Sequence, residues 1–156
     1  MRQRLSLLFA SGLFVGFIPG APGTYASILT SLVVYLAAPP ARRIPPELHA
    51  SVLAFVTVLG AMAAERVCRS RGGSDPSYVV VDEILGQLAA FLFVPITPAS
   101  LVLGTLLFRI LDIWKPFGIR RLEKLPHGVG ILADDLAAGI LACVALHATN
   151  LLLFRS

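Results

Sequence analysis

The sequence predicts an all-α integral membrane protein: a bundle of about five spanning helices preceded by a short N-terminal re-entrant or interfacial helix. Of its 156 residues, 56% are hydrophobic and 14% are charged, whereas soluble domains carry about 25% charged residues. The mean hydropathy of +0.82 agrees with segments that face lipid. The length is that of one domain, so we expect residues 1–156 to form a single unit.

The N-terminal segment, residues 1–18, places Arg2 and Arg4 before an apolar run. The pattern resembles a signal peptide but lacks a good cleavage site. The run of about 14 residues is too short to cross a bilayer comfortably. We therefore expect a re-entrant or interfacial helix, and the following Pro- and Gly-rich stretch should end it, with Thr24 as cap of the next helix.

Five further apolar segments, separated by Pro- and Gly-rich stretches, are the expected spanning helices: 25–38, 47–67, 79–94, 99–115 and 132–154. Pro116 should end the fourth, because proline disfavours helical geometry at the residue before it. If every segment crosses, the unusual polar residues gather on one side of the membrane. They are Thr24, Asp75, Asp82, Glu83, Arg109, Asp112, Lys115, His127, Asp134 and Asp135. The same side collects most Arg and Lys residues, which predicts that it faces the cytoplasm.

The net charge of +4 is mild. Basic residues in such a chain face anionic headgroups or set topology, so we expect no nucleic-acid partner. Cys68 and Cys143 lie far apart without metal-ligand spacing, so neither a disulfide nor a zinc site is expected.

Three charged residues, Arg109, Asp112 and Lys115, follow one another at intervals of three at the end of an apolar segment. This spacing places them on one helix face. Charges at this position in a membrane helix indicate a functional site by default. The alternative is a salt-bridged helix end anchored at the interface, since Arg and Lys readily extend to the headgroups.

Carboxylates in or beside apolar segments supply the candidate catalytic and metal-binding residues: Asp82, Glu83, Asp112, Asp134 and Asp135. They cannot all stay ionised together without cations. A donor set of oxygens favours Mg²⁺. Mg²⁺ beside Arg109 and Lys115 would suit a phosphate group, with Thr24 and the glycines before it adding donors at a helix start.

Two weaker candidates are Asp75, as a second-tier carboxylate, and His127, which is either a general acid or a plain loop histidine. Asp82 and Asp135 are each followed four residues later by a glycine, Gly86 and Gly139. The glycines indicate close helix packing, room for a metal with its waters, or both.

Four blocks of the sequence resemble the phosphatidylglycerophosphatase A family, bacterial membrane enzymes that convert phosphatidylglycerophosphate to phosphatidylglycerol. They are Pro-Gly-Thr-Tyr-Ala-Ser at 22–27, Asp-Pro through Asp-Glu to Gly at 75–86, Phe-Arg through Asp to Lys-Pro at 108–116, and Gly-Val-Gly through Asp-Asp at 128–135, with Ala138-Gly139 after it. The chain departs from the family pattern at Ala26, Ser74, Leu111, Gly118 and Val129, none of which removes a carboxylate or a key cation.

The resemblance implies an all-helical, Mg²⁺-dependent phosphatase of the bacterial inner membrane, with its active site facing the cytoplasm and its lipid substrate in the inner leaflet. The nucleophile is either water or a carboxylate. A cation transporter or channel subunit is the rival, because acids inside membranes also mark ion paths. A non-catalytic scaffold is the third reading, and phosphatidic acid or undecaprenyl pyrophosphate are other phosphatase substrates. The sequence does not determine the oligomeric state.

Overall fold

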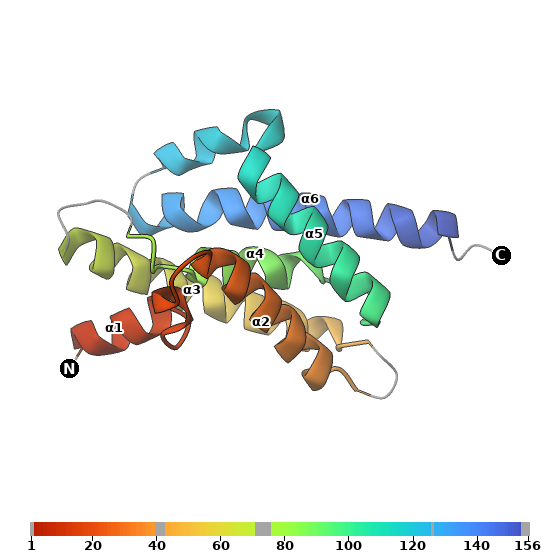
Figure 1. Ribbon diagram of the computed structural model, residues 1–156, viewed down its shortest axis with the longest axis horizontal. Coiled ribbons are helices and arrows are strands. Elements are labelled where there is room, and N and C mark those ends of the chain that lie inside the picture. Colours follow the sequence, from red (N-terminus) through yellow and green to blue (C-terminus); the bar gives the residue numbers. More distant parts are fainter. Residues whose placement is uncertain (1, 40–42, 71–75, 126, 154–156) are drawn as a thin grey trace.

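The computed structural model describes residues 2–39, 43–70, 76–125 and 127–153. Within these ranges the regular structure is entirely helical, which confirms the predicted all-α class (Figure 1). The α-helices are α1 (Arg2–Ala10), α2 (Pro22–Ala37), α3 (Pro46–Ser70), α4 (Val81–Ala90), α5 (Pro98–Trp114) and α6 (His127–Leu153). Two 3-10 helices, η1 (Val15–Phe17) and η2 (Pro116–Lys124), lie between them.

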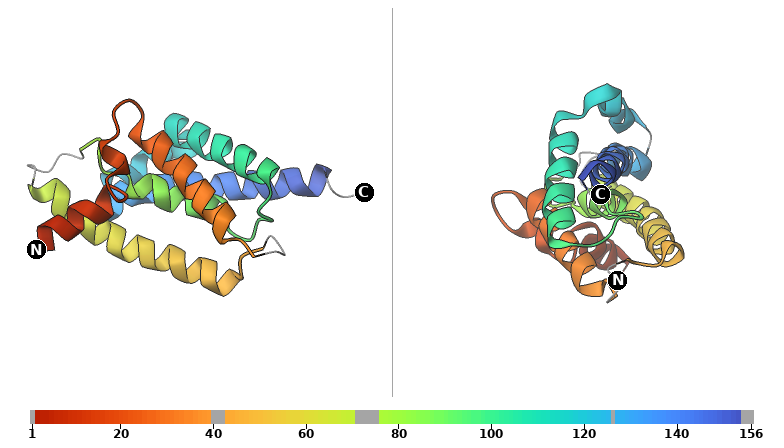
Figure 2. Two further views of the ribbon diagram at one scale, coloured as in Figure 1. Left: turned by 60° about the horizontal axis from the view of Figure 1, so that its bottom comes forward. Right: turned by 90° about the vertical axis from the view of Figure 1, so that its right-hand side faces the viewer.

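The short helix α4 is the centre of the bundle and contacts α2, α3, α5 and α6 (Figures 1 and 2). Glycines allow α4 and α6 to touch. A Cβ added at Gly139 would lie 2.1 Å from the carbonyl oxygen of Gly86, and one at Gly86 would lie 2.4 Å from the ring of Phe108. The predicted close packing through these glycines is therefore confirmed. It holds the first turn of α4 against the early part of α6.

Helix α5 has clear start and stop signals. Thr97 and Ser100 form a reciprocal capping box, and Pro98 occupies the first turn. The helix ends at Trp114, Lys115 adopts a left-handed conformation with φ of 46°, and Pro116 follows. The predicted stop at Pro116 is confirmed.

Large apolar side chains are exposed along four helices, as expected for a surface that faces lipid rather than water. They are Ile28, Leu29, Leu32, Val33 and Leu36 of α2, Leu48, Val52, Phe55, Val58 and Met62 of α3, Val102, Leu106, Ile110 and Ile113 of α5, and Ile140 and Val144 of α6. Among the described residues, two helices are long and apolar enough to cross a membrane, within Pro46–Ser70 and Gly128–Thr149.

The prediction of about five spanning helices is not confirmed. Helix α4 has 10 residues and α2 has 16. At 1.5 Å per residue, α4 extends about 15 Å, half the thickness of the hydrocarbon core. A continuous apolar run in the sequence therefore marks a helix buried among other helices here, not a helix that crosses the bilayer alone.

Several predicted boundaries also differ. Ala21, not Thr24, is the N-cap of α2, and Thr24 lies within its first turn. The predicted loop 116–131 contains η2, and α6 begins at His127 instead of near residue 132. Gly128 and Gly130 lie in this helix at points where neighbouring backbone leaves no room for a side chain. Added Cβ atoms would lie 2.0 Å from the carbonyl oxygen of Ala61 and 2.2 Å from that of Leu125.

Candidate active site

A cavity of about 320 Å³ opens beside the N-terminal ends of α2 and α4. It is lined by Ala21, Pro22, Gly23 and Thr24 at the start of α2, Pro76, Ser77 and Val79 before α4, Asp82 and Glu83 in α4, and Arg109 in α5. The volume lies near the lower end of the range of about 300–1,000 Å³ found for small-molecule sites. Segments far apart in the sequence thus supply polar groups to one cavity, as predicted.

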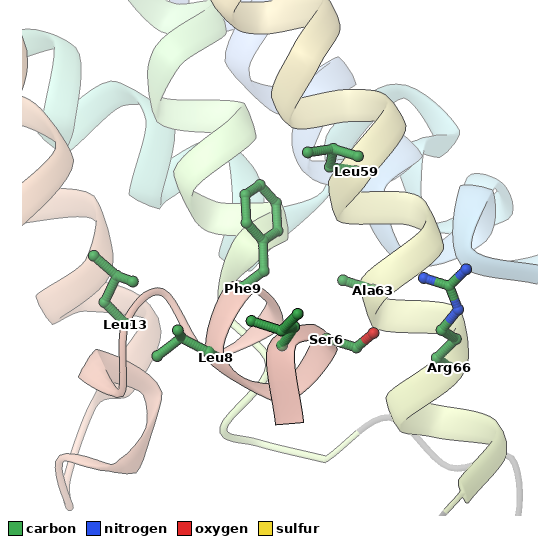
Figure 3. A pocket seen from close by; sticks show the side chains of 8 residues that line it. Ser6, Leu8, Phe9, Leu13, Leu59, Ala63 and Arg66 are labelled. Atoms are coloured by element: carbon green, nitrogen blue, oxygen red, sulfur yellow. The ribbon is translucent and has the colours of Figure 1, made fainter. Parts of the chain in front are cut away.

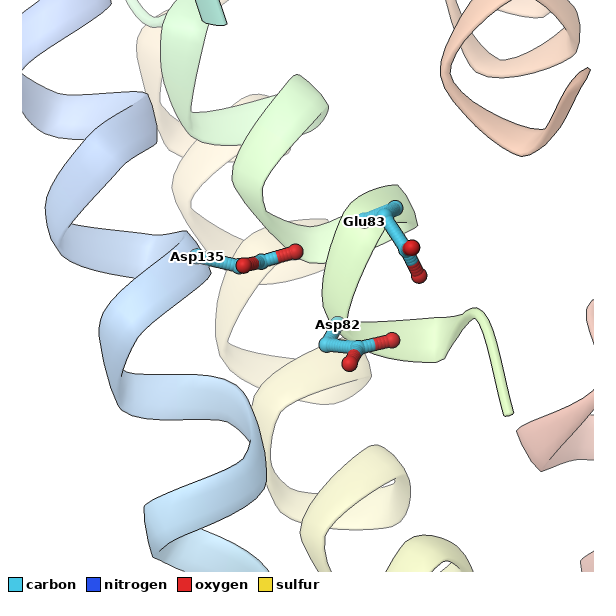
Figure 4. Close-up of side chains that lie close together, drawn as sticks. All are labelled: Asp82, Glu83 and Asp135. Atoms are coloured by element: carbon cyan, nitrogen blue, oxygen red, sulfur yellow. The ribbon is translucent and has the colours of Figure 1, made fainter. Parts of the chain in front are cut away.

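Three carboxylates meet at the contact between α4 and α6. One oxygen from each of Asp82, Glu83 and Asp135 lies within 4.8 Å of the others. Asp135 extends from α6 to the first turn of α4, which carries the other two (Figure 4). The glycine contact one turn further along both helices produces this approach.

This carboxylate cluster offers the oxygen ligands that a hard divalent cation prefers. Glu83 Oε2 and Asp135 Oδ2 are buried and accept no hydrogen bond from the described residues. Buried carboxylates that approach one another repel unless a cation or a proton neutralises them. A set of oxygen ligands from two helices fits Mg²⁺ better than a softer metal.

Arg109 connects α5 to the cluster. Its Nη1 donates a hydrogen bond of 2.7 Å to Asp112 Oδ2 and lies 3.9 Å from Glu83 Oε1. The side chains of Asp112 and Asp135 are close enough to interact electrostatically. The salt-bridged helix end suggested by the sequence therefore exists, yet the same arginine also lines the cavity.

Lys115 and Asp134 form a second, adjacent group. Lys115 Nζ donates hydrogen bonds to Asp134 Oδ2 and, at 2.8 Å, to Glu123 Oε1. Partial burial alone would lower the pKa of Lys115, but the bonds to Asp134 and Glu123 outweigh it and raise the pKa above its usual value. Neither Lys115 nor Asp134 lines the 320 Å³ cavity.

We expect Lys115→Gln to destabilise the fold by about 1–3 kcal/mol, because it leaves Asp134 buried without its charged partner. The folded pKa of Lys115 is raised, so its contribution is fully present below the unfolded pKa of about 10.4 and is lost as pH rises through the folded pKa. The difference in stability between wild type and Lys115→Gln should therefore stay constant from pH 6 to 9, as measured by thermal unfolding in detergent. A difference that disappears below pH 8 would contradict this assignment.

The first turn of α2 adds backbone donors to the cavity. Pro22, at the first helical position, has no N–H, and the N–H groups of Gly23 and Thr24 follow at this helix end. A helix N-terminus favours an anion through these donors and through the helix dipole. Thr24 is half-buried and lines the cavity.

The sequence indicated Gly23 only as a backbone donor at a helix start, and its contact with Glu83 was not predicted. A Cβ at this position would lie 2.0 Å from Glu83 Oε1, so the Glu83 carboxylate rests against the backbone of α2. The only signal in the sequence was the Pro-Gly-Thr block at a helix start. Gln87 was also missed: it is fully buried, one turn after Glu83, and neither amide atom is paired within the described residues.

Gly23→Ala should lower kcat/KM by about 10- to 100-fold, because the added methyl displaces the Glu83 carboxylate by an ångström or more. Stability should change by less than about 1 kcal/mol, since a side-chain end moves instead of backbone and alanine favours helix. Initial rates and thermal unfolding check both parts. Ile28→Ala, on the exposed face of α2, is the control and should retain wild-type activity; equal activity of the two variants would refute the role of this contact.

Asp75 lies outside the described residues, as does the side chain of His127, whose backbone begins α6. The remaining predicted residues come together in two adjoining groups. Asp82, Glu83, Arg109, Asp112 and Asp135 adjoin the cavity with Thr24, while Lys115 and Asp134 pair beside them.

Exposed apolar helix faces, together with an arginine beside buried carboxylates, fit a membrane protein that acts on an anionic substrate. The family model of phosphatidylglycerophosphatase A matches residues 8–150, and the chain belongs to this family. The family resemblance drawn from the four sequence blocks is thereby confirmed.

Curated relatives align over most of the chain. The chain is 30% identical to phosphatidylglycerophosphatase A of Escherichia coli over 142 residues, 90% of this chain and 80% of that protein. It is 31% identical to phosphatidylglycerophosphatase A of Haemophilus influenzae over 145 residues, 90% and 86%. A Bacteroides thetaiotaomicron protein, provisionally named a phosphatidylinositol-3-phosphatase, is 34% identical over 148 residues, 91% of each chain. No solved structure is significantly similar to the chain.

Proposed function

We propose that this chain hydrolyses the terminal phosphomonoester of phosphatidylglycerophosphate to phosphatidylglycerol and phosphate in phospholipid biosynthesis, and that the reaction requires Mg²⁺. Membership of the family supports the substrate. The observation that supports a requirement for Mg²⁺ is the cluster of Asp82, Glu83 and Asp135, which lies beside a cavity lined by Arg109.

The carboxylate cluster would hold the cation, with Asp112 adjoining it and Asp134 at its Lys115 side. Bound Mg²⁺ supplies positive charge for the phosphate oxygens and acidifies the attacking water. Arg109 and the N–H groups at the start of α2 would bind the phosphate, with the Thr24 hydroxyl assisting. Water attacks phosphorus while a nearby carboxylate accepts its proton. The bond to the glycerol oxygen breaks, and that oxygen takes up a proton to give phosphatidylglycerol.

Lys115 neutralises Asp134 and lies close enough to Asp135 to interact with it electrostatically. We therefore assign it to holding the cluster in place as well as to attracting the phosphate. Asp75 and His127 stay predictions for a second-tier carboxylate and a general acid for the leaving alkoxide.

We place the protein in the bacterial cytoplasmic membrane as a single multi-pass domain, with the site at the cytoplasmic surface. The exposed apolar faces of α2, α3, α5 and α6 support contact with lipid. The basic residues that follow α5, including Arg120 and Arg121, support a cytoplasmic position for the end that carries the cluster.

The transporter alternative receives less support. It requires acids spaced along a path through the bundle. The acids of the cluster occupy the first turn of α4 and a position about two turns inside α6, so they gather at one end.

Phosphatidylinositol 3-phosphate is the second candidate substrate, because the Bacteroides relative is named for it.

The test is phosphate release by purified protein in mixed micelles from four substrates: phosphatidylglycerophosphate, phosphatidylinositol 3-phosphate, phosphatidic acid and water-soluble glycerol 3-phosphate. Each is assayed with Mg²⁺ and with EDTA. We expect the highest kcat/KM for phosphatidylglycerophosphate, with Mg²⁺ only. A higher kcat/KM for another lipid would contradict the proposed substrate, and full activity in EDTA would contradict the proposed requirement for Mg²⁺.

A further inference from the structure

A second cavity, of about 430 Å³, lies between α1 and α3. Phe9 of α1 points toward Leu59 and Ala63 of α3 (Figure 3). Leu5 and Leu8 of α1 and Arg66 of α3 also line the cavity. The cavity shares no lining residue with the 320 Å³ cavity of the candidate active site.

Arg66 supplies a positive charge at one end of this otherwise largely apolar cavity. Its side chain is exposed, and none of the described residues forms an ion pair with it. Arg69, one turn away, differs: its Nη2 lies 2.6 Å from Glu65 Oε1. The guanidinium of Arg66 is thus available to an external anion, whereas that of Arg69 is engaged.

The cavity has a charged end and an apolar end, in the same order as the headgroup and acyl chain of a lipid that lies along a membrane helix. Helix α3 is long and apolar enough to span, and Arg66 lies four residues before its end. Leu59 lies about two turns further into the apolar part. A guanidinium at headgroup level above an apolar surface matches a phosphate above an acyl chain.

We propose that the cavity between α1 and α3 binds one anionic glycerophospholipid, with its phosphate on Arg66 and an acyl chain against Phe9, Leu59 and Ala63. This site is independent of the proposed phosphatase reaction. By joining α1 to α3, the bound lipid stabilises the N-terminal helix on the bundle.

The experiment is native mass spectrometry of the full chain, released from detergent after titration with phosphatidylserine or with phosphatidylcholine of the same acyl chains. Phosphatidylserine is neither substrate nor product of the proposed reaction. We expect the protein to retain one phosphatidylserine molecule tightly and to bind phosphatidylcholine more weakly. Arg66→Gln should weaken phosphatidylserine binding about fivefold, the effect of one basic residue near an anionic surface. Leu59→Trp, which fills the cavity, should weaken both lipids.

Two controls separate this site from its surroundings. Arg69→Gln removes a neighbouring charge that is already paired with Glu65. Arg109→Gln removes the guanidinium that lines the cavity of the candidate active site. Both should retain wild-type phosphatidylserine binding. Equal affinity for the two lipids in the wild type, or unchanged phosphatidylserine binding in Arg66→Gln, would overturn the proposal. Loss of binding in Arg109→Gln alone would assign the lipid to the active site and would also overturn it.

Discussion

Asp135→Asn should reduce kcat/KM for phosphate release by at least about 10²-fold while the protein remains folded. The substitution keeps the size of the side chain but removes one charged oxygen from the carboxylate cluster. The loss of a preorganised charged group in such a site costs about 10²- to 10³-fold. Stability should not fall, because the variant relieves repulsion between buried acids. Initial rates and thermal unfolding in the same detergent measure both effects.

Glu123→Gln is the matched control for this prediction. Glu123 is also an acid close to the site, and it accepts a hydrogen bond from Lys115, but its side chain is 46% exposed and lies outside the cluster. We expect its activity to stay within about twofold of wild type, as for most surface substitutions. If Asp135→Asn retained as much activity as Glu123→Gln, the cluster would not be the catalytic centre.

Gly139→Val should have the largest effect on stability. Even a Cβ at this position would lie 2.1 Å from the carbonyl oxygen of Gly86 and 2.8 Å from its carbon. These are backbone atoms, so α4 and α6 must separate to admit the side chain. We expect a loss of about 3 kcal/mol or more, which corresponds to a fall in Tm of about 10 °C in a chain of this length.

Activity should fall together with stability in Gly139→Val, because the separation of α4 and α6 moves Asp135 away from Asp82 and Glu83. Val144→Ala is the control, because Val144 of α6 is 60% exposed and its truncation opens no cavity in the core. The Tm of this variant should stay within about 2 °C of wild type. A Gly139→Val protein with the Tm of Val144→Ala would show that the two helices do not need this contact.

The helical class and much of the site could be predicted from local sequence signals. Prolines and glycines marked most helix ends, and the rarity of acids in a chain so apolar indicated Asp82, Glu83 and Asp135. Local signals could not show which apolar segments form helices long enough to cross a membrane. Helix α4 is apolar because other helices surround it, and a buried helix and a spanning helix have similar composition.

Adjacent residues also separated in a way that composition does not indicate. Asp134 and Asp135 are neighbours in the sequence, but consecutive side chains on a helix point about 100° apart. Asp135 therefore joins the carboxylate cluster while Asp134 meets Lys115. Predicting that split requires the rotation of α6 about its axis, which its glycine contact with α4 sets.

Contacts between distant helices account for the features of the site that the sequence did not predict. The role of Gly23 depends on the approach of α2 to Glu83, and the burial of Gln87 depends on the helices that enclose α4. No single segment contains this information.

We expect Asp82, Glu83 and Asp135 to bind a divalent cation together. Mn²⁺ binding to purified wild type, Asp135→Asn and Glu123→Gln, measured by electron paramagnetic resonance of the free ion, tests it directly. We predict saturable binding to wild type and Glu123→Gln, and at least tenfold weaker binding to Asp135→Asn. Equal Mn²⁺ binding by all three folded proteins would contradict the claim.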